Sequence, residues 1–114
     1  MILTAEQIKK ANDIKTIELN VPEWGGSVKI AEFNVKTRGE FELWVQKNKD
    51  NLASMRERLA LLVLVDEHGN KLFNEADLPI LQGKNGKILD RIFEAACKLN
   101  GLFNDGLDKE VKKS

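Results

Sequence analysis

The residues best suited to acid–base or nucleophilic chemistry are few and lie far apart in the sequence. The 114-residue chain contains one histidine, His68, and one cysteine, Cys97. Catalysis near neutral pH needs a group that exchanges protons there, or a nucleophile beside a base. His68 lies in the polar segment 66–70, which is typical of a turn, and Cys97 lies at the edge of an apolar helical stripe, where a free cysteine usually packs. We therefore expect no catalytic residues and no enzyme activity.

Metal and cofactor sites are not indicated either. One histidine and one cysteine cannot build a zinc site, and the acidic residues around segment 66–75 lack the spacing of an EF-hand. The segment Gly83–Lys87 contains glycines and lysines without the spacing of a P-loop. The carboxylates of Glu40 and Glu42 would point in different directions on a helix. We expect no metal and no cofactor.

The charge balance argues against nucleic-acid and membrane partners. The chain has 18 basic and 18 acidic residues, so the long-range attraction to a polyanion is missing. Four basic residues form a modest patch, Lys84, Lys87, Arg91 and Lys98, with Asp90 and Glu94 between them. The two carboxylates indicate a salt-bridged face exposed to solvent. The longest apolar run, Leu59–Val65, is too short to span a bilayer. With no signal-peptide pattern and a single cysteine, the sequence predicts a cytoplasmic protein.

The first third of the chain predicts a helix and a β-hairpin. Thr4 and Gln7 have the spacing of a capping box, which predicts a short helix to about Asn12. The segment Thr16–Val21 alternates apolar and polar residues and predicts a half-buried strand. A turn through the Gly25-Gly26 pair leads to a second strand, Ser27–Phe33, in which the alternation slips near residues 30–31 and suggests a bulge.

A heptad-like stripe then predicts one or two helices. Either Asn34 or Thr37 can be the N-cap, and the stripe then follows at alternating steps of four and three: Phe41, Val45, Asn48, Leu52, Met55, Leu59 and Leu62. Asp50-Asn51 could interrupt it, with Asn51 as a new N-cap, or the helix could run through. The stripe is either an internal packing face, which we favour, or an oligomer seam.

The second half predicts the centre of the core and a final helix. The run Leu59–Val65 is apolar on every side, so we expect a fully buried helix there, with a buried strand as the alternative. A tight turn at 66–70 would return Lys71–Phe73 beside it. Asn74 would cap a short helix with Asp77 at N3, and Pro79 lies so deep in it that we expect the helix to be bent or brief. The last helix runs from about Lys87 to Asn100 and ends at Gly101.

These elements predict one α+β domain over residues 1–103, in which an N-terminal β-hairpin packs against four to five helices. Residues 104–114 are polar and are expected to form a flexible tail. The most conspicuous surface for protein contact is the hairpin tip, Glu23, Trp24, Gly25 and Gly26. A tryptophan in a turn either folds back over the sheet, which we favour, or projects as an interface anchor.

Three segments in order resemble the tail assembly chaperones of long-tailed, siphovirus-type bacteriophages. They are the hairpin segment Val21–Val28; Arg56, Leu59 and Ala60 followed by Leu64–Phe73; and Ile88–Ala96 followed by Leu99–Leu102. The resemblance extends from about Ile8 to Leu102. The chain departs from the family in a short segment at Lys47–Asn51 and in a glycine, Gly39, within a predicted helix.

The resemblance implies a protein that coats the tape-measure protein during tail assembly in the host cytoplasm and is absent from the mature virion. It also implies self-association, and a longer form, made by translational frameshifting, that binds the tail tube protein. Lys112-Lys113 could be encoded by a slippery A-rich run. The alternative is a small regulatory or inhibitor protein that binds a single protein partner.

Overall fold

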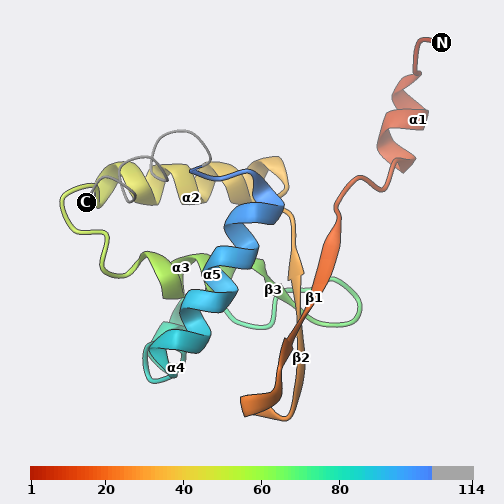
Figure 1. Ribbon diagram of the computed structural model, residues 1–114. Helices are drawn as coiled ribbons and strands as arrows, with labels where there is room; N and C mark the ends of the chain where they lie inside the picture. Colours follow the sequence, from red (N-terminus) through yellow and green to blue (C-terminus); the bar gives the residue numbers. More distant parts are fainter. Residues whose placement is uncertain (104–114) are drawn as a thin grey trace.

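The computed structural model describes residues 1–103 and shows a three-stranded antiparallel sheet packed against helices (Figure 1). The predicted α+β class, with a hairpin in a single small domain, is confirmed. The predicted tail at 104–114 lies outside the described residues. The elements in chain order are α1 (Ala5–Lys10), β1 (Thr16–Val21), η1 (Pro22–Trp24), β2 (Gly26–Ala31), α2 (Val35–Lys47), α3 (Met55–Val63), β3 (Leu64–Val65), η2 (Glu75–Asp77), α4 (Leu78–Gln82) and α5 (Gly86–Asn100).

The β-hairpin forms where the alternation predicts it, but it contains no bulge. The pairing of β1 with β2 is continuous from Thr16 opposite Ala31 to Val21 opposite Gly26. The predicted bulge near residues 30–31 is therefore wrong. Ile30 and Ala31 are both buried although they point to opposite faces, because this end of β2 is covered on both sides. Burial of both faces removes the alternation from the sequence without changing the register.

The apolar run Leu59–Val65 is divided between a helix and a strand. Its first five residues end α3, and Leu64 and Val65 form β3, which pairs with Lys29 and Ile30 of β2. The predicted helix and its strand alternative are thus each correct for part of the run, and the whole run except Leu62 is buried. The return of the chain is also confirmed, since Lys71 bridges Val65 and the Leu72 N–H donates to the Leu64 carbonyl over 3.1 Å.

The heptad-like stripe is interrupted between α2 and α3. Asn34, not Thr37, caps α2, since its side-chain oxygen accepts from the Thr37 N–H at 2.8 Å. The helix ends at Lys47, and α3 begins after Ser54, which makes no side-chain capping bond. The suggested N-cap at Asn51 is wrong. Phe41, Met55 and Leu59 of the stripe are buried in one core, which supports the internal packing face.

The C-terminal elements follow their local capping signals. Asn74 and Asp77 make a reciprocal capping box around η2, as predicted. A new helix, α4, then begins at Leu78, which places Pro79 in its first turn, where a missing N–H costs nothing. The helix after Asn74 is thus brief, as expected from Pro79, but Pro79 itself lies in the first turn of a second short helix and not deep in the first. Gly101 ends α5 in the left-handed conformation with φ 63°, as the sequence indicates.

The core lies between the sheet and the pair α3 and α5. These two helices contact each other, and α5 also contacts both β1 and β2. In Figure 1, α2 runs across one end of the α3–α5 layer and α1 stands away from the body. Burial along β1 increases toward the hairpin turn, from Ile17 at 36% exposed to Val21 at 0%, because α5 covers that end of the hairpin.

Candidate protein-binding surface

The hairpin tip is built by a short 3-10 turn between the two strands. Pro22 fixes the first residue of η1, and the Gly25 N–H closes the turn by donating to the Pro22 carbonyl at 2.9 Å. Gly25 has φ 81°, a conformation that a residue with a Cβ rarely adopts. Trp24 is 39% exposed, so its ring is neither fully covered by the sheet nor fully free. The structure thus presents part of an aromatic face at a rigid turn.

The tip is joined to α5 by an ion pair. The Arg91 guanidinium donates to the Glu23 carboxylate across 68 positions of sequence. This hydrogen bond holds the pKa of the Glu23 carboxyl below its ordinary value of 4.5. Glu23, one of the predicted contact residues, therefore also helps to fix the orientation of the tip relative to the core.

The ion pair of Glu23 with Arg91 should make a pH-dependent contribution to the stability of the fold. Because the pKa of Glu23 is lower in the folded state, the contribution is complete above the unfolded-state pKa and is lost as pH falls through the folded-state pKa. We expect Glu23→Gln to lower Tm slightly at pH 7, and the difference from the wild type to disappear at acid pH. Thermal unfolding at pH 7 and at stepwise lower pH measures this, with Glu18→Gln on β1 as the control. A difference that grows toward acid pH would contradict the assignment.

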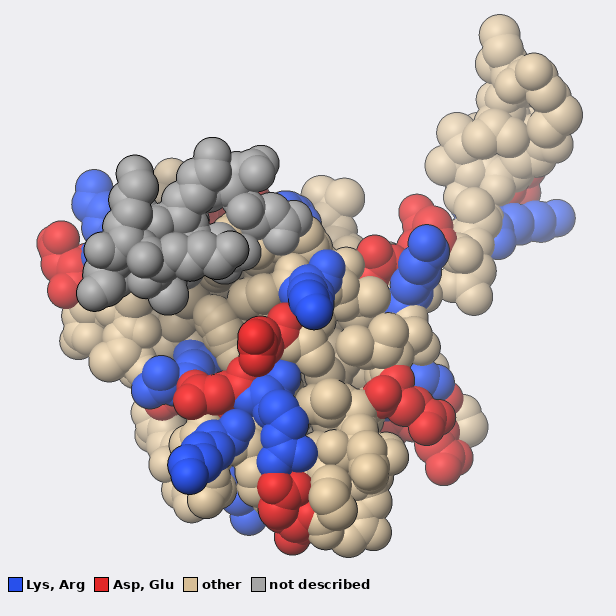
Figure 2. Space-filling model, viewed as in Figure 1, with Lys and Arg blue, Asp and Glu red and all other residues tan. Residues whose placement is uncertain are grey.

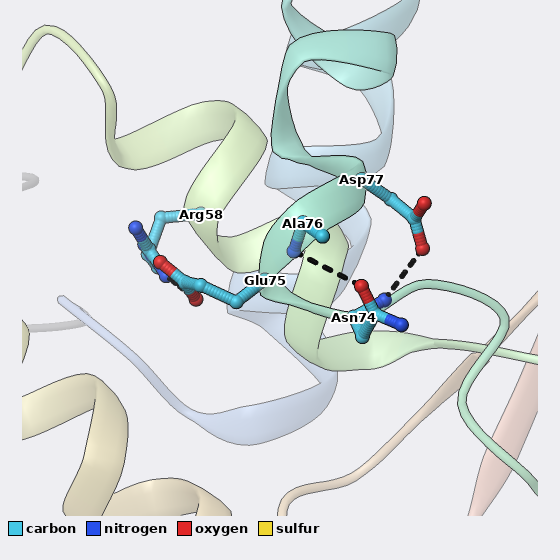
Figure 3. Close-up of polar contacts among 5 residues, drawn as sticks. All are labelled: Arg58, Asn74, Glu75, Ala76 and Asp77. Carbon is cyan, nitrogen blue, oxygen red and sulfur yellow. Dashed lines mark hydrogen bonds and ion pairs between the residues drawn. The ribbon is translucent and has the colours of Figure 1, made fainter.

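A second cluster ties α3 to the segment that precedes α4. Arg58 forms an ion pair with Glu75 (Figure 3). Its guanidinium also lies 5.8 Å from the centroid of the Trp44 ring. Beside it, Asn74 accepts from the Ala76 N–H at 3.0 Å and donates its own backbone N–H to Asp77 at 2.9 Å. The hydrogen bond from Arg58 keeps the pKa of Glu75 below 4.5. These contacts are structural, and they fix the outer surface of α3 against η2.

The residues considered for chemistry are not brought together. His68 lies in the turn 66–70, where Asp66 accepts from the N–H groups of Asn70 and His68 at 3.0 and 2.8 Å. These bonds, that of Asn70 first, hold the pKa of Asp66 below its ordinary value of 3.8. Cys97 is half-buried in α5 and does not line the hollow that His68 lines. Within residues 1–103, no group of three metal-ligating side chains is placed to hold an ion.

The charged side chains around α5 are interleaved rather than segregated by sign. Figure 2 shows basic and acidic residues alternating over this face. Arg56 lies 3.3 Å from Asp90, and Arg91 is paired with Glu23, so two of the arginines on this face have carboxylate partners. This pattern agrees with a solvated, ion-paired face. In the described part of the chain, no helix is both long and apolar enough to cross a membrane.

Sequence reasoning missed the most exposed apolar surface, which is the N-terminal arm, defined here as residues 1–15. Met1 and Ile2 are almost completely exposed, and Leu3 and Ile8 are 54% and 61% exposed. The capping box at Thr4 was predicted and is present. The sequence indicated only indirectly that the apolar side chains of this arm are exposed. The indication is that α1 is too short to bury an apolar stripe and that the polar residues Asn12 and Asp13 follow it.

The arrangement is that of a small α+β domain whose notable features are exposed apolar segments on a packed core. Residues 3–113 match the family model described as phage tail assembly chaperone. The chain therefore belongs to the phage tail assembly chaperone family. The fold is similar to that of a solved structure, that of the bacteriophage HK97 tail assembly chaperone, with a TM-score of 0.61 and 21% sequence identity over 82% of this chain and 90% of that chain. No curated protein matches the sequence.

Proposed function

We propose that this protein binds the tape-measure protein during phage tail assembly in the host cytoplasm and is absent from the mature virion. The observation that carries the proposal is the family match over residues 3–113, which spans nearly the whole chain. The protein would act by binding, with no catalytic step. The exposed apolar segments of this protein would bind by covering apolar surface on that partner.

Within this function, we assign the hairpin tip as a contact surface for the tape-measure protein. Its two glycines leave the backbone beside Trp24 unobstructed, since a Cβ at either position would meet nothing within 4 Å. A partly exposed tryptophan on a rigid turn loses little conformational freedom on binding and is typical of an interface anchor. The ion pair of Glu23 with Arg91 supports the rigidity of the tip.

Co-expression with the tape-measure protein tests this function. We expect the wild-type protein to keep a co-expressed tape-measure protein soluble and to be retained with it in a pull-down. Trp24→Ala should weaken this binding at least tenfold, which corresponds to about 1.4 kcal/mol, whereas Leu43→Ala, at an exposed position of α2, should leave it unchanged. A tape-measure protein that is equally insoluble with and without this chain would overturn the proposal. If the Trp24→Ala variant is retained with the tape-measure protein as well as the wild type is, only the assignment of the hairpin tip as a contact surface is overturned.

We further propose that the protein self-associates and that a longer, frameshifted form binds the tail tube protein. Lys112-Lys113, the candidate position of the frameshift, lies outside the described residues. The coding sequence tests this part directly. A repetitive A-rich run at these codons with an overlapping downstream frame is expected, and its absence would remove the frameshift.

A further inference from the structure

The exposed apolar residues are concentrated at the N-terminus. Of the eleven large apolar residues that are exposed in the described chain, five lie in the N-terminal arm, residues 1–15: Met1, Ile2, Leu3, Ile8 and Ile14. Single exposed apolar side chains are ordinary on a protein surface, but a contiguous set on one segment indicates a contact surface. In Figure 1 this N-terminal arm leaves the sheet at β1 and carries α1 away from the body.

The sequence specifies α1 locally but provides it with no core. Thr4 and Gln7 make a complete capping box, and Leu3 and Ile8 occupy the positions that form a hydrophobic staple across it. None of the six residues of α1 is buried. Helices shorter than roughly 12 residues are marginal in water and depend on packing against other elements. A second surface must therefore cover α1 for this helix to persist.

A surface of suitable chemistry lies beside α2. Two adjoining hollows of about 400 and 410 Å³ share Leu62 and Lys71. Together they form what we name the α2 groove, which runs from Ala31 and Thr37 past Leu62 and Glu40 to Leu72 and Phe73. Leu62, Leu72 and Phe73 provide apolar surface along it, and Leu72 is 48% exposed. The Arg58–Glu75 pair and the capping box at Asn74 hold its far end in place (Figure 3).

The charges of the arm and of the groove are complementary. The last turn of α1 carries Lys9 and Lys10, and within residues 1–103 only Lys9 of the two has a carboxylate neighbour, Glu6 at 3.5 Å. The two hollows are lined by four glutamates and two lysines, which are Glu32, Glu40, Glu67, Glu75, Lys29 and Lys71. An apolar helix face flanked by lysines thus matches an apolar groove flanked by an excess of carboxylates.

The groove is better placed for the arm of another copy than for its own. Asn12 and Ile14, at the root of the arm, themselves line the groove, and beyond them the chain runs away from the body to α1 (Figure 1). Its own α1 could reach Leu72 only by reversing direction within residues 11–14, where Ala11 is extended with ψ 129°. The arm of a second copy needs no such reversal.

We propose that α1 of one copy binds in the α2 groove of a second copy, with Leu3 and Ile8 against Leu62, Leu72 and Phe73. This inference specifies the contact for the self-association included in the proposed function, and rests on it. The zero net charge of the chain does not oppose association of copies. Exchange of a terminal element between identical chains is a common route to dimers and larger assemblies.

The first test is the effect of polar substitutions on molar mass. The double variant Leu3→Asp, Ile8→Asp removes the apolar contact without touching the core, since both residues are exposed. Light scattering over a concentration series should show the wild type associating and this variant needing at least tenfold higher concentration. Ile80→Asp, also exposed but outside the groove, should associate like the wild type. A monomeric wild type, or unchanged association of the double variant, would overturn the inference.

Disulfide trapping then identifies the occupant. In a Cys97→Ser background, a chain with Ile8→Cys mixed with a chain with Leu72→Cys should form a covalent heterodimer on oxidation. The matched pair, Ile8→Cys with Ile80→Cys, should not. If one chain carrying both Ile8→Cys and Leu72→Cys instead closes a disulfide at monomer mass, the arm occupies its own groove and the second-copy inference is wrong.

The co-expression assay separates this inference from the proposed function. If Leu3→Asp, Ile8→Asp stays monomeric but still keeps the tape-measure protein soluble, the arm contact is confirmed and tape-measure binding does not depend on it. If the same variant associates normally but loses the tape-measure protein, the arm binds that partner and the inference is overturned. A failure of the wild type in the solubility assay, with trapping intact, would remove the tape-measure function while leaving the arm contact.

Discussion

Phe41→Ala is expected to lower the free energy of unfolding by about 3–5 kcal/mol, the usual cost of truncating a buried phenylalanine. Phe41 is 2% exposed and lies in α2 between two other rings. Its centroid is 5.6 Å from that of Phe33 and 6.3 Å from that of Phe103. The truncation would leave a cavity where the end of β2, α2 and the residues after α5 meet.

The position of Phe41 explains why the loss should be large. Phe33 follows β2, and its N–H donates to the Asn100 side chain at 2.7 Å, while Phe103 also stacks on Phe93 of α5 at 6.4 Å. Phe41 therefore connects α2 with the segment after β2 and with the segment after α5. The aromatic contacts contribute stabilisation beyond that of the buried area. A domain of this size loses roughly 4–8 °C in Tm for each kcal/mol. Denaturant and thermal unfolding of purified protein measure both quantities.

A matched control lies two residues away in the same helix. Leu43 is 52% exposed, so Leu43→Ala should change the free energy of unfolding by no more than about 0.5 kcal/mol. Similar losses for Phe41→Ala and Leu43→Ala would show that α2 is not packed on the core through Phe41. Leu43→Ala is also the control variant in the binding assay. Comparing the stabilities of the variants separates a loss of binding caused by unfolding from one caused by a local change at the surface.

Local rules in the sequence predicted the elements whose ends are determined by neighbouring residues. Thr4 with Gln7, Asn74 with Asp77, and Gly101 after α5 are capping signals that act over a few residues, and all three are present. The strand Thr16–Val21 was predicted with its correct bounds, because only one of its faces is covered and the alternation is preserved.

The errors lie where packing between distant segments overrides the local pattern. The run Leu59–Val65 is buried both as helix and as strand, so its sequence contains no signal for the change at Leu64. Ser54 precedes α3 without a side-chain capping bond, which explains why the start of this helix could not be located. Ile30 and Ala31 are both buried, so the alternation of apolar and polar residues is interrupted there, and this interruption led to the prediction of a bulge.

The candidate site was predictable only in part. The turn at the hairpin tip was predicted from its two glycines. For Trp24 the sequence left two alternatives, a ring folded back over the sheet, which we favoured, or a projecting anchor, and the ring is 39% exposed. The ion pair of Glu23 with Arg91 joins positions 68 residues apart, and no local rule could place them together. A helix was predicted within the N-terminal arm. That this helix does not pack on the core depends on the direction of the chain between α1 and β1, which is a property of the tertiary structure.

Leu59→Ala is expected to cost about 2–5 kcal/mol and to test whether the α3–α5 layer is the centre of the core. Leu59 is 0% exposed, at the point where the heptad-like stripe meets the apolar run Leu59–Val65. Alanine is a stronger helix former than leucine, so any loss must come from the cavity and from lost burial, not from helix propensity.

The companion substitution Leu59→Met nearly conserves volume and should cost less than about 1.5 kcal/mol. Ile80→Ala, at a half-exposed position of α4, is the control for truncation outside the core. Equal costs for Leu59→Ala and Leu59→Met would mean that side-chain shape, not the cavity, determines the loss. A cost for Leu59→Ala no larger than that for Ile80→Ala would place Leu59 on a surface and favour the alternative in which the stripe is an oligomer seam. With the expected order, the buried part of the stripe belongs to the core, and association of copies must use exposed surface, which the N-terminal arm provides.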